Sequence, residues 1–298
     1  DENSCLGLDP AQVRIFQQGI MPAVDAESGR LILSAKDSLA MGPDGHGGTL
    51  AALDRTGALD AMLAEGVEHL FYFQVDNPLI TLCDPVFIGH HILSKSEMTT
   101  QVIRKRYPTE KVGNVVQVDG RTRIIEYSDL PDEAAEMTLD DGSLKLWAGN
   151  IAVHLFELDF LKRAKSQASA LPFHRAHKKV PFVDDRGHTV HPDAPNATKF
   201  ERFIFDLLPS ADRTLIYEVE PADAFAPVKN ANGAATDTPE LAQKAMVTQH
   251  QRLIRQSGGD IKDGVTVEIN PRFAMDSTEL AHRLGENLTV ETDRYFAG

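Results

Sequence analysis

The chain has 298 residues, of which 42% are hydrophobic and 25% are charged. These are ordinary values for globular proteins, and they exclude a disordered, collagenous or coiled-coil chain. At roughly 150 residues per domain, the length predicts one or two domains. The 44 acidic residues outnumber the 30 basic ones and give a formal charge of -14, which repels nucleic acid and anionic lipid headgroups, so neither is an expected partner.

Cysteine content and hydropathy indicate a reducing compartment without membrane contact. The two cysteines, Cys5 and Cys83, cannot form a disulfide framework or a zinc knuckle, and we therefore expect a cytoplasmic protein. No apolar run approaches the ~18 residues of a membrane span. The chain opens with Asp1 and Glu2 and has no initiator methionine, so we expect a processed product or a piece of a longer protein.

The first part of the chain alternates strand-like and helix-like segments. Residues 13–17 predict a strand, residues 42–48 a glycine-rich loop, and residues 49–64 one amphipathic helix. Residues 69–75 predict a strand that is too continuously apolar for a sheet edge, which favours the middle of a sheet covered on both faces. This strand ends at Asp76.

Two further segments carry strong local signals. Residues 84–94 predict a helix, because they open with an aspartate, a typical N-cap, followed by proline in the first turn. Residues 114–125 alternate on both sides of Asp119 and Gly120, a pair typical of a tight hairpin turn. A hairpin among βα units predicts a mixed sheet.

The rest of the chain continues this alternation. Further strands are predicted at residues 144–152, 214–219 and 265–269, and further helices at residues 200–208, 238–256 and 276–284. The expected fold is α/β, with a mixed, mainly parallel sheet and flanking helices. Small and polar residues at 233–239 predict a boundary between a core of residues 1–235 and a small α+β C-terminal domain of residues 236–298.

Two of these segments are candidates for binding a nucleotide. Residues 42–48 hold four glycines before a predicted helix, where the backbone can approach a ligand closely and free N–H groups face an anion or a base edge. Asp76 follows a buried strand, and a carboxylate there suits Mg²⁺ bound to phosphates. From the residues alone, an ordinary glycine-rich turn and a turn-capping aspartate stay open as explanations.

Polar residues further along suit a phosphorylated sugar. Glu126 follows the hairpin, and Asn150 follows a glycine. Because a carboxylate accepts hydrogen bonds and an amide both donates and accepts them, both side chains can bind hydroxyl groups. Lys199 and Lys229 offer ammonium groups that neutralise phosphate charge during transfer. Taken one at a time, these residues also have ordinary explanations. Glu126 suits an exposed strand end, Asn150 suits a turn, and the two lysines suit a solvated surface. The histidines lack paired ligand motifs, which argues against a zinc site.

Taken together, these segments resemble the UDP-N-acetylglucosamine pyrophosphorylase family, the eukaryotic-type uridylyltransferases that make UDP-sugars from UTP and a sugar 1-phosphate. The matches run in order along most of the chain. They include a Pro-Asp-Gly-x-Gly-Gly loop at residues 43–48 and a Val-Asp-Asn run at residues 75–77. The other matching segments are residues 16–23, 112–113, 126–128, 149–151, 178–184, 203–206 and 225–231, with Lys199.

The resemblance implies a Rossmann-like nucleotidyltransferase core and a role for each matching residue. Gln18, Pro43 and Gly45 are expected on the nucleotide, and Asp76 is expected to bind Mg²⁺, the one implied cofactor. The residues expected around the sugar are His46, Gly113, Glu126, Tyr127, Asn150, Phe203 and Phe205. The expected catalytic residues are Asp76, Lys199 and Lys229, with both lysines facing phosphate oxygens.

The implied reaction is in-line attack of a sugar 1-phosphate oxygen on the α-phosphorus of UTP, which forms the UDP-sugar and releases pyrophosphate. The family's glycine-rich Gly-Gly-x-Gly-Thr-Arg loop does not precede residue 16, so we expect this 298-residue chain alone to be inactive. N-acetylglucosamine 1-phosphate is the first expected substrate. Because His46 replaces a family asparagine, glucose and galactose 1-phosphates stay open. A sugar-nucleotide-binding module without turnover is the alternative of a different class.

Overall fold

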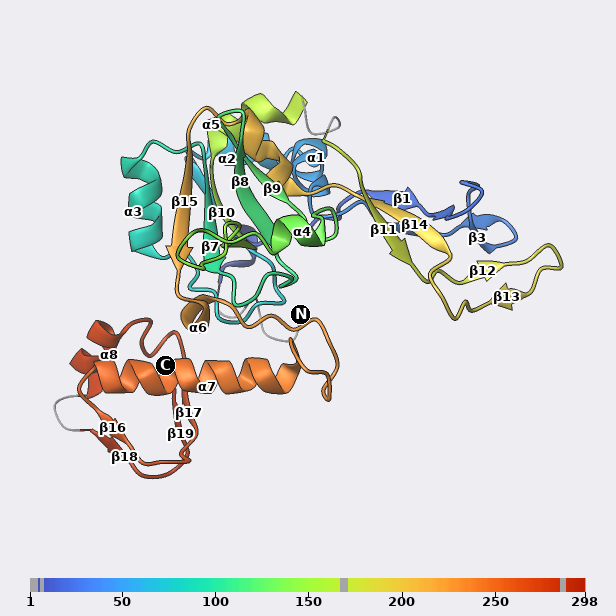
Figure 1. Ribbon diagram of the computed structural model, residues 1–298. Helices are drawn as coiled ribbons and strands as arrows, with labels where there is room; N and C mark the ends of the chain where they lie inside the picture. Colours follow the sequence, from blue (N-terminus) through green and yellow to red (C-terminus); the bar gives the residue numbers. More distant parts are fainter. Residues whose placement is uncertain (1–4, 6–7, 167–170, 285–287, 298) are drawn as a thin grey trace.

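The computed structural model describes Cys5 and residues 8–166, 171–284 and 288–297 (Figure 1). A central six-stranded sheet with helices on both faces occupies the middle of the molecule. An arm of short strands extends from one side, and a C-terminal segment built around one long helix lies below the sheet in Figure 1. None of the helices in these described ranges combines the length and the apolar character needed to cross a bilayer.

The central sheet has the strand order β15–β7–β10–β8–β9, with β6 paired to the C-terminal half of β10. The strands are β6 (His69–Tyr72), β7 (Met98–Arg104), β8 (Gly113–Val118), β9 (Arg121–Ile125), β10 (Ala148–Glu157) and β15 (Thr214–Val219). The predicted mixed α/β sheet is confirmed. The prediction that it is mainly parallel is wrong for the described residues: β10 runs antiparallel to all three of its neighbours, and β8 to β9, which leaves β15 and β7 as the parallel pair.

The hairpin lies where the sequence predicts it. β8 and β9 pair in antiparallel register, with Val118 opposite Arg121. Asp119 and Gly120, which connect them, both have positive φ angles, 51° and 74°. Two consecutive positive φ angles match the twist of a two-residue hairpin, which explains the Asp-Gly pair.

α3 (Pro85–Leu93) covers one face of the sheet. Its predicted N-cap is confirmed, since the Asp84 carboxylate accepts a hydrogen bond from the Val86 amide at 2.9 Å. Phe87 of this helix is fully buried in a cluster with Val153 of β10. Burial of such an aromatic side chain contributes about 2–3 kcal/mol to holding the helix on the sheet.

The other face is covered by α1 (Gly48–Arg55), α2 (Ala58–Ala64) and α5 (Leu158–Ala164), whose apolar residues pack in one cluster. The single helix predicted over residues 49–64 is therefore divided in two. Gly57 lies between the halves with a φ of 69°, a left-handed conformation that breaks the helical hydrogen-bond pattern and that glycine adopts at little cost.

β6 is shorter than predicted and lies at an edge. Leu70 and Tyr72 pack against the cluster on one face, and Phe71 packs against the cluster on the other. Within the described residues β6 pairs with β10 alone, so the predicted place in the middle of the sheet is wrong. Its continuous apolar run reflects cover on both faces and carries no information about its neighbours along the sheet.

Two other predicted elements differ from the structure. Residues 13–17 form no strand, and Ile15 is 87% exposed, so its apolar side chain is not packed against a sheet. Residues 200–208 do not form an α-helix. Their first residues belong to β14 (Ala197–Glu201), whose backbone bonds to β11, and a 3₁₀ helix, η4 (Ile204–Ser210), follows.

The arm consists of short strand pairs. β1 (Ile20–Pro22) pairs with β5 (Met41–Pro43), and β14 lies between β11 (His174–Lys178) and β2 (Val24–Asp25). The remaining pairs are β3 (Leu33–Ala35) with β4 (Ser38–Leu39) and β12 (Phe182–Val183) with β13 (Thr189–Val190). A small apolar cluster around Ala23 and Ala197 holds the arm together.

The C-terminal segment has its own apolar cluster, centred on Ile254, Val267 and Leu280. Its elements are α7 (Pro239–Gln256), β16 (Asp260–Ile261), β17 (Val267–Ile269), α8 (Ser277–Leu284), β18 (Thr289–Val290) and β19 (Arg294–Phe296). Three shorter helices lie elsewhere: η2 (Pro10–Gln12), α4 (Asp132–Ala135) and α6 (Pro221–Ala224). α7 contacts α6 through a hydrogen bond from the Gln249 side chain to the Asp223 carbonyl at 2.9 Å and an ion pair between Arg252 and Asp223.

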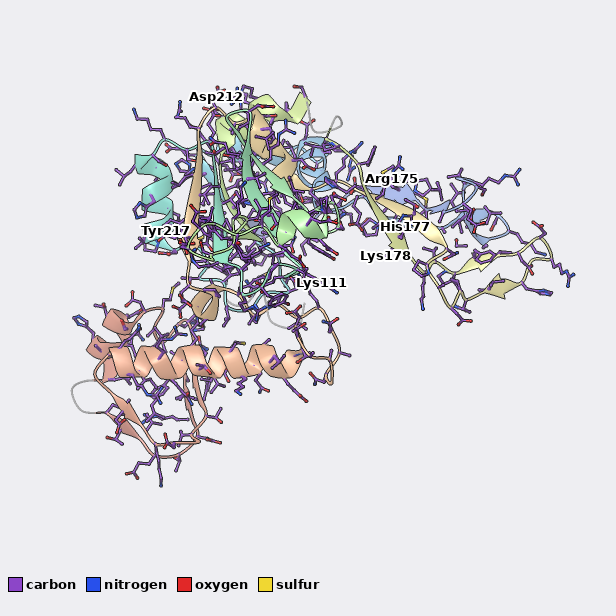
Figure 2. All side chains as sticks on the ribbon, in the orientation of Figure 1. Lys111, Arg175, His177, Lys178, Asp212 and Tyr217 are labelled. Atoms are coloured by element: carbon purple, nitrogen blue, oxygen red, sulfur yellow. The ribbon has the colours of Figure 1, made fainter. Side chains whose placement is uncertain are left out.

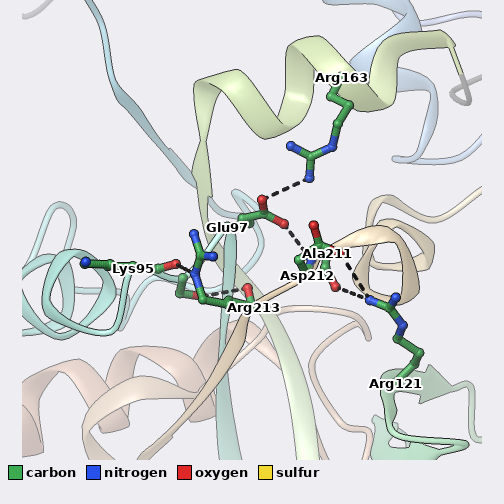
Figure 3. Close-up of polar contacts among 8 residues, drawn as sticks. Lys95, Glu97, Arg121, Arg163, Ala211, Asp212 and Arg213 are labelled. Carbon is green, nitrogen blue, oxygen red and sulfur yellow. Dashed lines mark hydrogen bonds and ion pairs between the residues drawn. The ribbon is translucent and has the colours of Figure 1, made fainter.

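A buried carboxylate ties three elements together at the start of β7 (Figure 3). Glu97 forms an ion pair with Arg163 of α5 at 3.0 Å and accepts the Asp212 amide at 2.6 Å. Arg121 of β9 donates to the Ala211 carbonyl at 2.9 Å. These contacts fix the end of η4 and the start of β15 against the sheet (Figure 3).

Candidate functional site

A cavity of about 210 Å³ lies where β8 and β10 meet η4 and the loops that follow β5, β6, β9, β14 and α6. It is lined by most of the residues singled out from the sequence. These are His46, Asp76, Gly113, Glu126, Tyr127, Asn150, Phe203, Phe205 and Lys229. The cavity therefore brings together a carboxylate, a lysine and a set of uncharged polar and aromatic side chains.

Asp76 lies in the turn that follows β6, and its position is fixed from the loop that carries Lys229. The main-chain carbonyl of Asp76 accepts the Val228 amide at 2.8 Å. The neighbouring side chain of Asn77 is buried and donates to the Ala224 carbonyl at 2.7 Å, while its oxygen accepts the Ala226 amide at 3.0 Å. These bonds hold the Asp76 and Lys229 loops as one unit.

His46 reaches the cavity because Gly45 lets the loop pass very close to another segment. Gly45 has a φ of 83°, and a Cβ at this position would lie 2.4 Å from the main-chain oxygen of Arg202. No other residue type fits such a contact. Two backbone hydrogen bonds stabilise this contact: the Gly47 amide donates to the Arg202 carbonyl at 2.7 Å, and the Arg202 amide donates to the Asp44 carbonyl at 2.8 Å.

The tautomer of His46 follows from its contacts. Its Nδ1 accepts the backbone amide of Ile204 at 3.1 Å, so in the neutral ring the proton sits on Nε2, which becomes a donor. Burial, with a smaller contribution from the nearby charge of His174, lowers the pKa of His46 to about 4. At neutral pH the ring therefore offers a hydrogen bond without a charge.

A bulge in β10 shapes the floor of the cavity. The β10–β7 register shifts between Asn150 and His154, and Ala152 has a φ of 57°, unusual for a residue with a side chain. The Asn150 side-chain oxygen accepts the Ala152 amide at 3.2 Å. The amide group of Asn150 is thus oriented by the bulge and can donate to a ligand.

Glu126 and Gly113 form one corner of the cavity. A Cβ on Gly113 would lie 3.0 Å from Glu126 Oε1 and 2.6 Å from the side chain of Ile124, so a larger residue would displace both. Burial raises the pKa of Glu126 to about 7. Close to neutral pH this carboxyl group exists in both forms, as a donor and as an acceptor of hydrogen bonds.

Four predicted residues lie outside the cavity lining. Gln18 donates to Asp44 Oδ1 at 3.2 Å and to the Gly45 carbonyl at 3.1 Å, so Gln18 and Gly45 support the loop that ends in His46. Pro43 is the last residue of β5 in the arm. Lys199 lies on β14 in the arm, with its Nζ 3.5 Å from a Cβ built on Gly42.

The sequence reasoning missed Lys111, Gln74 and Phe225, which also line the cavity. Lys111 lies directly before a matching Val-Gly pair, and Figure 2 places it at the lower edge of the core. Its position next to this pair could have marked Lys111 as a candidate. Phe225 likewise opens the segment that ends at Lys229.

A second, larger cavity of about 420 Å³ lies between α7, β17 and the loop after Asn77. Its charged groups include Asp223 and Arg252, which form an ion pair with each other. In the smaller cavity, Asp76 and Lys229 come from different loops and both face the hollow. Chemistry therefore favours the smaller cavity over the larger one.

The smaller cavity also fits a magnesium ion bound mainly by phosphates. Within the described residues no group of three or more His, Cys, Asp and Glu side chains could hold a metal ion. Mg²⁺ usually takes one or two carboxylates from a protein and fills its shell with water and substrate phosphates. Asp76 supplies such a carboxylate, half-buried at the cavity wall.

Comparison with a family model gives a match over residues 7–283 to "UTP–glucose-1-phosphate uridylyltransferase". The human UDP-N-acetylhexosamine pyrophosphorylase-like protein 1 is 42% identical over 88% of this chain and 52% of its own length. The Saccharomyces cerevisiae UDP-N-acetylglucosamine pyrophosphorylase is 34% identical over 96% of this chain and 61% of its own length. The chain thus spans little more than half the length of these curated relatives.

Among solved structures, the UDP-N-acetylglucosamine pyrophosphorylase from Trypanosoma brucei, in complex with an inhibitor, superposes with a TM-score of 0.82 and 28% identity. The superposition covers 98% of this chain and 64% of that one. A UDP-glucose pyrophosphorylase mutant from Leishmania major has a TM-score of 0.57 at 16% identity, which shows the fold alone.

Proposed function

Because this chain belongs to the UTP–glucose-1-phosphate uridylyltransferase family, as its resemblance to the UDP-N-acetylglucosamine pyrophosphorylases predicts, we propose that its parent protein transfers the uridylyl group of UTP to a sugar 1-phosphate. The observation that carries this proposal is the cavity that Asp76 and Lys229 share with the polar residues Glu126 and Asn150 and with the aromatic residues Phe203 and Phe205. The expected inactivity of the 298-residue chain on its own stays a prediction.

The nucleotide side is proposed at the loop of residues 42–48. Gln18, Pro43 and Gly45 contact the uracil portion, where Gln18 already bonds to this loop. Asp76 holds Mg²⁺, which would supply positive charge to the phosphates of UTP. Asp76 and Lys229 keep a fixed separation because the Asp76 and Val228 backbones are bonded to each other.

The sugar side is proposed at the opposite wall. Glu126 and Asn150 exchange hydrogen bonds with hydroxyl groups, and the Nε2–H of His46 donates to the substituent at the second carbon. Phe203 and Phe205 form an apolar wall against the ring carbons. The proposed sugar-binding residues are His46, Gly113, Glu126, Tyr127, Asn150, Phe203 and Phe205.

The chemistry is a displacement at phosphorus. An oxygen of the sugar 1-phosphate forms a bond to the α-phosphorus of UTP, and the bond to the pyrophosphate oxygen breaks with its electron pair. Lys229 neutralises charge on the phosphate oxygens, and Lys199 acts on them from the arm, beside the loop of residues 42–48. The residues contribute by positioning the two substrates in line, which accounts for a large part of the rate in such transfers.

N-acetylglucosamine 1-phosphate is the proposed substrate, in keeping with the names of the curated relatives. Glucose and galactose 1-phosphates are the second candidates, because His46 presents one donor where an amide side chain would present a donor and an acceptor. A binding module without turnover is the remaining alternative.

Three further proposals concern organisation. Residues 1–235 form a Rossmann-like nucleotidyltransferase core, and residues 236–298 form a small C-terminal domain, supported by the separate apolar cluster around Val267. A cytoplasmic location is supported by Cys5 and Cys83, which are both free thiols.

The experiment that tests the function measures pyrophosphate release by the whole gene product with UTP and a panel of sugar 1-phosphates. Turnover with at least one sugar supports the uridylyltransferase. Tight binding of UDP-sugars without any release would favour the binding module, and ATP replacing UTP without loss of rate would refute the uracil site.

A further inference from the structure

Phe203 of the cavity wall lies between two histidine rings. Its centroid is 4.9 Å from that of His46, with planes 22° apart, and 4.4 Å from that of His174, with planes 31° apart. His46 lines the cavity, whereas His174 lies behind the wall as the first residue of β11. The three rings form a column that runs from the arm into the cavity.

Both ring nitrogens of His174 face carboxylates. Nε2 lies 2.9 Å from Asp206 Oδ2, on η4, and Nδ1 lies 3.2 Å from Asp129 Oδ2, in the turn after β9. Ionised carboxylates only accept hydrogen bonds, and a neutral imidazole has one N–H. Two bonds of this kind therefore require the doubly protonated, positively charged ring.

The surroundings of His174 favour that charge. Hydrogen bonding to Asp206, which outweighs burial, raises its pKa above the ordinary value. Among the described residues, the ionisable groups near it include Asp129, Glu126, His46 and its cross-strand partner Glu201. Of these, buried His46 is neutral at physiological pH, and Glu126 is near its own titration point.

We propose that His174 is a positioning residue for the sugar side of the cavity. Its imidazolium, clamped between Asp129 and Asp206, fixes the ring of Phe203. The expected effect on binding of the sugar 1-phosphate rests on the proposed function. Phe203 in turn sets His46, both by ring contact and because the next amide, of Ile204, is the donor that defines the His46 tautomer.

The consequence is selective for one substrate. Loss of the His174 charge breaks one of the two carboxylate bonds, and the Phe203 ring and the Ile204 amide are then free to shift. The sugar wall moves, whereas the uracil loop around Gln18 keeps its own hydrogen bonds to Asp44 and Gly45. Affinity for the sugar 1-phosphate falls and affinity for UTP does not.

The test compares His174→Gln with His177→Gln in the whole gene product. His177 lies on the same strand and is exposed, with Arg175 and Lys178 as exposed neighbours on the arm (Figure 2). We expect His174→Gln to raise KM for the sugar 1-phosphate about tenfold, with KM for UTP unchanged, and His177→Gln to change neither. Equal losses for both substrates, or equal effects of both variants, would overturn the proposal.

A pH profile separates positioning from a merely structural role. In the wild type, KM for the sugar 1-phosphate should rise as the pH passes upward through the His174 pKa. Asp206→Asn removes the main partner of that charge, so the rise should move to lower pH. A profile that stays in place in Asp206→Asn contradicts the inference, and this variant serves equally if His174→Gln fails to fold.

A ligand-free measurement keeps the inference distinct from the proposed function. In NMR titrations of the protein, the Phe203 ring resonances should follow the titration of His174. If the wild type turns over no sugar 1-phosphate, the proposed function is refuted. The positioning role of His174 is refuted only if the Phe203 resonances do not respond to His174, or if His174 titrates at or below its ordinary pKa.

Discussion

The main-chain amide of Val228 donates to the carbonyl oxygen of Asp76 over 2.8 Å, although the two residues are far apart in the sequence. The bond joins the turn after β6 to the loop after α6. Each loop carries one charged side chain into the same cavity, Asp76 from the first and Lys229 from the second. The carboxylate proposed to bind the metal and the ammonium proposed to bind phosphate are thus linked through one backbone hydrogen bond.

The Asp76 carboxylate is expected to be essential for turnover. Asp76→Asn keeps the size of the side chain and removes the charge that would hold Mg²⁺, so kcat should fall by about three orders of magnitude, or about 4 kcal/mol in the barrier. The measurement is pyrophosphate release by the whole gene product. Asp185→Asn, an exposed aspartate in the arm, is the control, and turnover of Asp76→Asn at the wild-type rate would remove Asp76 from the mechanism.

The buried side chain of Asn77 is expected to hold the two loops together. Asn77→Ala removes its bonds to the Ala224 carbonyl and the Ala226 amide, which leaves buried polar groups without partners and should cost about 1–3 kcal/mol of unfolding free energy. Urea unfolding measures this loss. Asn232→Ala, at an exposed position where the side chain accepts one bond, from the Glu240 amide at 3.2 Å, should cost less, and equal stabilities for the two variants would contradict the role given to Asn77.

His46 is expected to decide between sugars. His46→Asn introduces a side-chain amide that both donates and accepts, so the ratio of kcat/KM for N-acetylglucosamine 1-phosphate over glucose 1-phosphate should rise about tenfold. Competition between the two sugar phosphates gives this ratio directly. An unchanged ratio would show that the substituent at the second carbon is read elsewhere in the cavity.

Acid is expected to destabilise the protein through its buried histidines. Burial lowers the pKa values of His46 and His91 to about 4 and that of His154 to about 3. Below about pH 6.5 the unfolded chain binds protons that the folded rings do not, so the free energy of unfolding falls by about 1.4 kcal/mol per pH unit for each ring until the folded pKa is reached.

The pH slope is measured by urea unfolding between about pH 7 and about pH 5. Burial raises the pKa of Glu126 to about 7, so this carboxyl group binds its proton first in the folded state and offsets one histidine over part of the range. His154→Gln removes one of these rings, so the free energy of unfolding should fall less steeply, by about 1.4 kcal/mol per pH unit. A stability that does not change with pH in the wild type would contradict the prediction.

Local signals in the sequence predicted local structure well. The Asp-Gly turn of the hairpin and the Asp84 cap of α3 depend on φ angles and hydrogen bonds between residues close in sequence. The bounds predicted for β15 agree with the structure for a related reason, since six successive residues fit one strand. Features of this kind need no knowledge of distant partners.

What the sequence could not predict depends on distant contacts. Residues 13–17 have the apolar pattern of a strand but form none, with Ile15 87% exposed, because the pattern does not say what packs against a segment. The break at Gly57 is different, since it comes from the left-handed conformation of one glycine, a local cause that the sequence could have indicated. Sequence motifs predict most of the candidate site, whereas no motif marks His174. Its partners, Asp129 and Asp206, are remote in sequence and meet it only in the fold.

The contacts between α7 and α6 bear on the position of Lys229. Gln249 and Arg252 of α7 hold Asp223, a few residues before the loop that ends in Lys229, yet none of the residues that line the smaller cavity comes from α7. A helix that contributes nothing to the wall of this cavity therefore supports the segment that leads to Lys229, and a tilt of that helix would be transmitted to the lysine.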